Sequence, residues 1–183
     1  HDLGLEEITP QDIIIIDFEG NKLVGQGRKH SEFPIHTEIY KMYPHINCII
    51  HTHPFYSLIL GATADTIKTI SHEGSLFAGI PIFTETALLI RSAELGQAVA
   101  GCLNEHRAIL LRNHGVVVAG TSIEEATVYA VLLERAAKLQ VMASQVGKFH
   151  SCSQTDIEGK GEQVFYSKNI MGFWDYFVRK LHK

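Results

Sequence analysis

Two histidines separated by a single residue, His51 and His53, interrupt the otherwise apolar stretch NCIIHTHPFYSLIL. On a β-strand, residues two apart point to the same face of the sheet, with Cα atoms about 6.6 Å apart at about 3.3 Å per residue. Two imidazoles placed in this way can bind one metal ion at about 2.0–2.1 Å from each ring nitrogen. The pair alone leaves open the simpler interpretation of two packed or surface histidines.

Two further motifs favour the metal interpretation. His114, in LLRNHGVVV, follows an apolar strand and precedes Gly115, which permits an unusual backbone turn, so His114 could be a third ligand or an ordinary turn histidine. Glu32, in KHSEFPIH, stands two residues before Pro34 at the start of an expected helix, where the helix dipole favours an ionised carboxylate. That helix leads through a short loop into the histidine strand, so Glu32 could fold back over the strand end.

Other polar residues give weaker signals. His36 and Tyr40 are four residues apart on one helix face, where they could line a cleft or simply pack. His72 and Glu73 lie in a glycine-punctuated loop that could border a substrate. No nucleotide-binding loop and no serine or cysteine nucleophile signature is found in the sequence.

Strands and helices that interleave along the chain must position these residues, and they predict one α/β domain with a central sheet. The continuous β-branched run at 12–18 predicts a strand buried on both faces, and Ser122 with Glu125 predicts a capping box at the start of the longest helix. Strands are expected at 12–18, 22–25, 47–53, 81–85 and on both sides of 113–115. Helices are expected at 34–42, 57–63, 92–105 and 121–143, with a docking helix near the C-terminal end.

Composition narrows the class of protein. The chain has 183 residues, 45% hydrophobic and 20% charged, with a net charge of −4 and no basic run, which argues against nucleic acid as a partner. No apolar stretch approaches the roughly 20 residues that cross a bilayer, so no membrane segment is expected. The cysteines are odd in number and widely spaced, which argues against a disulfide framework and favours the cytoplasm: Cys48, Cys102 and Cys152.

With these motifs in place, the sequence resembles the class II aldolase/adducin family, which has the fold of fuculose-phosphate aldolase and ribulose-phosphate 4-epimerase. Three blocks carry the resemblance, which runs from about residue 9 to about residue 143: HSEFPIHTEIYKMYP, CIIHTHP and LLRNHGVVVAG. It implies that residues 1–183 form a single three-layer α/β domain, with a central, mostly antiparallel sheet flanked by helices and an N-terminal segment missing. It also implies a homotetramer with the site between subunits.

The resemblance also implies roles for the motif residues. His51, His53 and His114 would hold a divalent ion, with zinc as first choice and manganese, iron or cobalt as alternatives. Glu32 would touch the metal in the resting site and serve as the acid/base. The epimerases carry Asp at that position, so Glu32 points away from epimerisation.

Two departures from the aldolase pattern bear on the substrate. His30 and Ser31 stand where the sugar-phosphate aldolases carry two phosphate-binding serines, and the family's phosphate loop would lie upstream of this chain. The HSE block resembles members that decarboxylate aromatic or hydroxy acids, where His30 could meet a carboxylate. We therefore expect a divalent-metal-dependent carbon–carbon lyase that acts on a small oxygenated substrate.

The expected reaction is aldol cleavage through a metal-stabilised enolate. One alternative is a metal-dependent decarboxylase of a hydroxylated aromatic acid, and another is a non-catalytic, adducin-like interaction module. A homo-oligomer is also expected, because the aromatic residues near the C-terminal end have little core left to join and could cover a neighbouring subunit: Phe173, Trp174, Tyr176 and Phe177.

Overall fold

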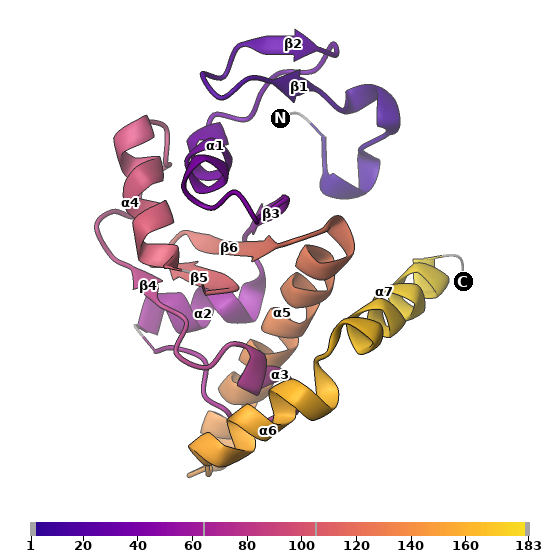
Figure 1. Cartoon of the computed structure of the whole chain (residues 1–183). Helices are drawn as coiled ribbons and strands as arrows, with labels where there is room; N and C mark the ends of the chain where they lie inside the picture. Colours follow the sequence, from indigo (N-terminus) through magenta and orange to yellow (C-terminus); the bar gives the residue numbers. More distant parts are fainter. Residues whose placement is uncertain (1–2, 64, 105, 182–183) are drawn as a thin grey trace. The chain divides into compact units, whose positions relative to one another are not determined.

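The computed structural model describes residues 3–63, 65–104 and 106–181 (Figure 1). The chain forms two compact units. Unit 1 comprises His1–Pro44 and Leu88–Gly101, and unit 2 comprises His45–Ala87 and Cys102–Lys183.

Unit 2 is built on a four-stranded sheet with the strand order β3-β6-β5-β4. The strands are β3 (Cys48–Thr52), β4 (Ile82–Phe83), β5 (Ala108–Leu111) and β6 (Gly115–Gly120). β6 pairs antiparallel with both β3 and β5, whereas β4 pairs parallel with β5. Every residue of β5 and β6 is buried, as the apolar runs on either side of residues 113–115 predict.

Helices of unit 2 pack against this sheet and against each other. The long helix α5 (Ile123–Val146) contacts β3 and β6, and α2 (Phe55–Thr63) contacts β5, β6 and α5. The core between them is apolar, with Phe77, Leu110, Val118, Leu132 and Leu133 fully or almost fully buried. The expected α/β class, with a central, mostly antiparallel sheet flanked by helices, is therefore confirmed. Within the described residues, no helix combines the length and the apolar character needed to cross a membrane.

The start of α5 contains half of the predicted capping box. Ser122 Oγ accepts a hydrogen bond from the Glu125 backbone N–H at 3.2 Å. The Glu125 carboxylate instead accepts from the backbone N–H and the hydroxyl of Thr121, at 2.6 and 2.7 Å. In a complete capping box the Glu125 carboxylate would accept the backbone N–H of Ser122, but here it binds Thr121, one residue earlier.

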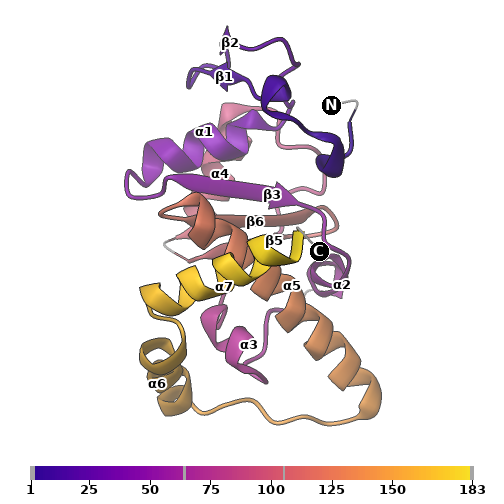
Figure 2. The same ribbon diagram turned by 90° about the vertical axis from the view of Figure 1, so that its right-hand side faces the viewer.

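The C-terminal part of the chain folds onto its own unit. Helix α7 (Ser167–Leu181) is the expected docking helix and lies beside α5, as the views in Figures 1 and 2 agree. Phe173, Trp174 and Phe177 pack against the core, and only Tyr176 remains largely exposed. The idea that these aromatic residues have little core to join is therefore wrong. Two short helices were not expected from the sequence: α3 (His72–Leu76) and α6 (Gln154–Val164).

Unit 1 contains a β-ribbon and two helices. Strands β1 (Ile15–Ile16) and β2 (Lys22–Val24) pair antiparallel, and η1 (Leu5–Glu7) and η2 (Pro10–Asp12) are 3-10 turns. The expected buried strand at 12–18 is wrong, since β1 has two residues, and Ile13 and Ile15 are 64% and 53% exposed. A two-stranded ribbon offers no second layer to cover such a β-branched run.

The helices of unit 1 pack closely. α1 (Phe33–Met42) meets α4 (Ala93–Leu103), where a β-carbon on Gly96 would lie 2.6 Å from the carbonyl oxygen of Pro34. The buried carboxylate of Glu38 accepts hydrogen bonds from Lys41 at 2.8 Å and from Gln97 at 3.1 Å. Together these contacts fix the helix that follows Glu32.

Candidate metal centre

Three histidines meet at one end of the sheet in unit 2. His51 is in β3, opposite Val117 of β6, and His53 follows directly after the end of β3. His114 lies in the turn between β5 and β6, where its backbone N–H donates to Leu111 O at 3.1 Å. The end of β3 and the start of β6 lie side by side because the two strands run antiparallel.

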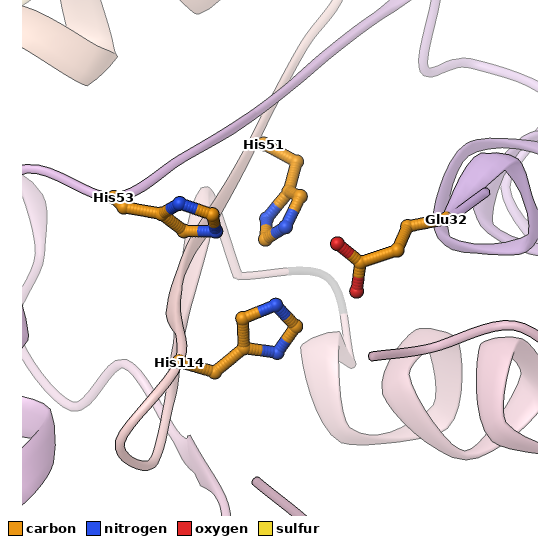
Figure 3. Close-up of side chains that lie close together, drawn as sticks. All are labelled: Glu32, His51, His53 and His114. Atoms are coloured by element: carbon orange, nitrogen blue, oxygen red, sulfur yellow. The ribbon is translucent and has the colours of Figure 1, made fainter. Parts of the chain in front are cut away.

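The three imidazoles converge (Figure 3). Their ring centroids lie 5.0 Å apart for His51 and His53, 5.1 Å for His51 and His114, and 5.4 Å for His53 and His114. One ligand nitrogen from each ring lies within 4.8 Å of the others. The trio could therefore hold one metal ion, and the assignment of these residues as ligands stays a prediction.

A backbone contact sets the orientation of the His51 ring. His51 Nδ1 and the carbonyl oxygen of Val116 are 2.9 Å apart. A carbonyl oxygen only accepts, so the proton must be on Nδ1, which makes Nε2 the nitrogen that can bind a metal. Metal-binding histidines in proteins commonly make this second contact, which fixes both tautomer and ring orientation.

The turn that carries His114 differs from the sequence-based explanation. The left-handed residue is Asn113, with φ 55°, whereas Gly115 does not have a positive φ. Gly115 is needed for space instead: a β-carbon there would overlap the imidazole of His53 and lie 2.6 Å from Thr52 O. The sequence motif indicates that a glycine is needed here. Its steric role depends on the neighbouring strand β3, so it follows from the fold and not from the motif.

Glu32 occupies the N-cap position of α1, in agreement with its expected place at the start of a helix. Figure 3 shows its side chain. Its side chain is buried, with 1% exposed, and Oε1 accepts a hydrogen bond from the Ile90 backbone N–H at 2.8 Å. This contact fixes the carboxylate within unit 1. Its roles as metal ligand and as acid/base remain predictions.

His30 and Ser31 precede Glu32 in the same turn. His30 is exposed, its Nδ1 accepts the Glu32 backbone N–H at 3.3 Å, and its carbonyl oxygen accepts from the Phe33 N–H, also at 3.3 Å. His30 therefore helps to form the entry to α1. The predicted substrate contacts of His30 and Ser31 stay predictions.

The weaker candidates lie on helices, and Glu73 makes an ion pair between two of them. His72 and Glu73 belong to helix α3 rather than to a loop, and Glu73 pairs with Arg135 of α5 at 3.0 Å. His36 and Tyr40 lie on α1 and are half-buried. Glu73 therefore contributes to the packing of α3 on α5.

Comparison with known proteins identifies the family. Residues 2–141 match the family model described as Class II Aldolase and Adducin N-terminal domain. The chain therefore belongs to the class II aldolase/adducin family, as its three sequence blocks predict. The N-terminal boundary and the assignment of residues 1–183 to a single domain stay predictions.

The relatives include enzymes with two kinds of chemistry. The chain is 31% identical over 144 residues to Decarboxylase NovR of Streptomyces niveus, covering 77% of this chain and 53% of NovR. It is also 31% identical over 141 residues to L-fuculose phosphate aldolase of Methanococcus maripaludis (strain C5), covering 77% and 75% of the two chains. The chain thus spans about half the length of NovR and about three quarters of the aldolase.

The fold is also similar to that of solved structures. An aldolase II superfamily protein from Pseudomonas syringae matches with a TM-score of 0.84 and 24% identity, over 98% of this chain and 75% of that one. This likeness confirms the fold. The family includes aldolases and decarboxylases, both of which are lyases.

Proposed function

We propose that the protein is a divalent-metal-dependent carbon–carbon lyase that cleaves a small oxygenated substrate by an aldol reaction. The observation that carries the proposal is the convergence of His51, His53 and His114, whose ligand nitrogens lie within 4.8 Å of one another. A non-catalytic, adducin-like interaction module would have no need for three converging imidazoles. The three converging histidines therefore favour an enzyme over an interaction module.

The donor set suits a catalytic divalent ion. Imidazole and carboxylate groups are ligand types that zinc accepts, and manganese, iron and cobalt accept them too. The tautomer of His51 leaves Nε2 for the metal. The missing side chain of Gly115 leaves room for the His53 ring. Both features fit a metal site. A bound ion would supply Lewis-acid stabilisation of the negative charge that develops on a substrate oxygen when the carbon–carbon bond breaks.

Glu32 is the group that we assign to proton transfer. Aldol cleavage requires a base to take the proton from the hydroxyl whose carbon becomes a carbonyl, and an acid to return a proton to the carbon left with the electron pair. A carboxylate can do both in turn. The hydrogen bond from the Ile90 N–H to Oε1 holds Glu32 in one orientation, and we assign the proton transfer to Oε2.

Decarboxylation of a hydroxylated aromatic acid is the second candidate. It shares the need to stabilise charge on carbon next to an oxygenated carbon. His30 and Ser31 in place of two serines favour it, and the chain is as similar to NovR as to the aldolase, at 31% identity to each. In this reaction His30 would bind the substrate carboxylate.

One panel of substrates separates the two reactions. Metal-loaded protein is incubated with sugar phosphates and with hydroxylated aromatic acids, while aldehyde release and carbon dioxide release are both measured, with protein stripped of metal as the control. Aldehyde from a sugar phosphate supports the aldolase, and carbon dioxide from an aromatic acid supports the decarboxylase. If protein that is shown to contain metal releases neither aldehyde nor carbon dioxide, both assignments are contradicted.

We also propose that the protein works as a homo-oligomer, a tetramer by family resemblance. Support comes from the β1–β2 ribbon of unit 1 and the residues just before it, where four large apolar residues are more than half exposed: Ile13, Ile15, Leu23 and Val24. Exposed apolar groups of this kind mark contact surfaces. Light scattering at micromolar concentration should give a multiple of the 20.4 kDa chain mass, and the mass of one chain would refute the proposal.

A further inference from the structure

We propose that Glu134 is a positioning residue for His53, the one of the three histidines that directly precedes Pro54 and the first turn of α2. This inference rests on the proposed metal site. Glu134 lies on α5, and its carboxylate binds the first turn of α2, which begins two residues after His53. It would act on the site through the backbone, without touching the ion.

The three histidines differ in how the sheet holds them. His51 lies within the β3–β6 ladder, and its ring binds Val116 O. His114 lies in the tight turn between β5 and β6, with its backbone N–H bonded to Leu111 O. His53 lies outside the ladder, because β3 ends at Thr52, and it is exposed. The segment that follows His53 therefore contributes to its position.

Glu134 accepts three hydrogen bonds from the first turn of α2. Oε1 accepts from the Tyr56 backbone N–H at 2.9 Å, and Oε2 accepts from the backbone N–H of Ser57 at 3.0 Å and from its hydroxyl at 2.8 Å. Hydrogen bonds to a carboxylate are stronger than those between neutral groups, and the helix dipole favours negative charge at an N-terminus. Glu134 thus fixes the start of α2 to α5.

Pro54 transmits this constraint to His53. Its carbonyl oxygen accepts the first helical hydrogen bond, from the Leu58 N–H at 3.0 Å. The proline ring fixes its own φ and restricts the preceding residue to extended conformations. The orientation of the first turn of α2 therefore sets the direction in which His53 leaves the strand, and Gly115 leaves room for the ring on the other side.

A simple stabilising role is the alternative, and Glu125 provides a matched control. It also lies on α5, and one of its oxygens likewise accepts a backbone N–H and a hydroxyl, both from Thr121. Glu125 comes after the C-terminal end of β6, whereas His114 lies just before its N-terminal end. The six residues of β6, at about 3.3 Å each, put about 20 Å between these two ends. Glu125→Gln therefore removes similar contacts without affecting the segment at His53.

The test is cobalt binding to protein that has been stripped of metal, followed by the visible absorption spectrum of the bound cobalt. Glu134→Gln should bind cobalt about 10–100-fold more weakly, with a changed spectrum, whereas Glu125→Gln should keep the affinity and spectrum of the wild type even if it unfolds at a lower temperature. Ser57→Ala, which removes one of the three hydrogen bonds, should shift both readouts in the same direction by less.

The outcomes separate this inference from the proposed function. If the wild type binds cobalt and both Glu134→Gln and Ser57→Ala keep its affinity and spectrum, the positioning role of Glu134 is overturned while the metal site stands. If Glu134→Gln does not fold, Ser57→Ala alone decides by the same criterion. A wild type that binds no cobalt overturns the metal site itself, and the positioning role with it.

Discussion

The imidazole of His53 occupies the space that a β-carbon on residue 115 would need, so His53, just after the end of β3, is sterically coupled to Gly115 at the start of β6. A β-carbon at that position would also lie 2.6 Å from the carbonyl oxygen of Thr52. Both contacts involve the end of β3, where the chain leaves the sheet. The glycine that follows His114 is therefore part of what allows a third imidazole to approach the other two.

Gly115→Ala should weaken metal binding while the protein stays folded. The added methyl must displace either the His53 ring or the end of β3, which separates the ligands. We expect at least a 10-fold loss of zinc affinity, comparable to the loss of an outer contact at a metal site, measured by competition with a chromogenic chelator. Gly101→Ala is the control, since a β-carbon there meets nothing within 4 Å. Equal affinities for both variants would contradict the steric role of Gly115.

Glu32→Gln should abolish turnover but keep much of the metal. The amide fills the same space, and three imidazoles still bind the ion, but no group remains to accept and return a proton. General acid–base catalysis commonly contributes about 10²–10⁴ in rate, and a loss in that range is expected on the identified substrate. Near-normal turnover would exclude Glu32 as the acid/base. Loss of metal as complete as in His53→Ala would make Glu32 chiefly a ligand.

The candidate site was largely predictable because its residues lie in local motifs. The strand that carries His51 and the turn that carries His114 are marked by apolar runs, and Pro34 marks the helix that begins after Glu32. What could not be predicted depends on contacts distant in sequence. No spacing pattern links Glu134 with residues 56 and 57.

The buried run at 12–18 failed as a prediction for a related physical reason. A β-branched sequence indicates an extended chain, but burial depends on whether other layers cover it, and β1 pairs only within a two-stranded ribbon. Helix α6 is not predicted from the sequence because it is polar, so it lacks the apolar periodicity by which the other helices are recognised. Its capping box at Ser153 and Asp156 is the signal that could have revealed it.

Gln140 should be important for stability although it is remote from the histidine motifs. It is fully buried on α5, where Oε1 accepts the Lys68 N–H at 2.6 Å and Nε2 donates to Thr66 O at 3.0 Å and to Asp65 Oδ2 at 3.1 Å. Gln140→Leu would leave these groups without their partner, at about 1–3 kcal/mol for each that stays buried. Urea denaturation should show this loss, and the exposed Gln154→Leu should not. Equal stability of both variants would contradict the assignment.

Glu38 should contribute to the loss of stability in acid. Its hydrogen bond with Lys41 is the main cause that lowers the carboxyl pKa below its ordinary value of 4.5, with help from Gln97 and against the opposing effect of burial. A lowered folded-state pKa stabilises the protein above the unfolded-state pKa, and this contribution disappears as the pH falls through the folded-state value. Glu38→Gln should therefore lose less stability on acidification, measured by urea denaturation at a series of pH values between about 6 and 3. A pH dependence identical to that of the wild type would contradict this role.

The central claim, that three histidines hold one divalent ion, is tested most directly by the zinc content per chain after chelation, dialysis against dilute zinc and removal of the excess. The account predicts about one ion per chain in the wild type, about one in His72→Ala, where the missing histidine is exposed on α3, and far less than one in His53→Ala. If the wild type retains no stoichiometric zinc, and none of manganese, iron or cobalt when each replaces zinc in the dialysis, or if His53→Ala retains as much as His72→Ala, the claim is wrong.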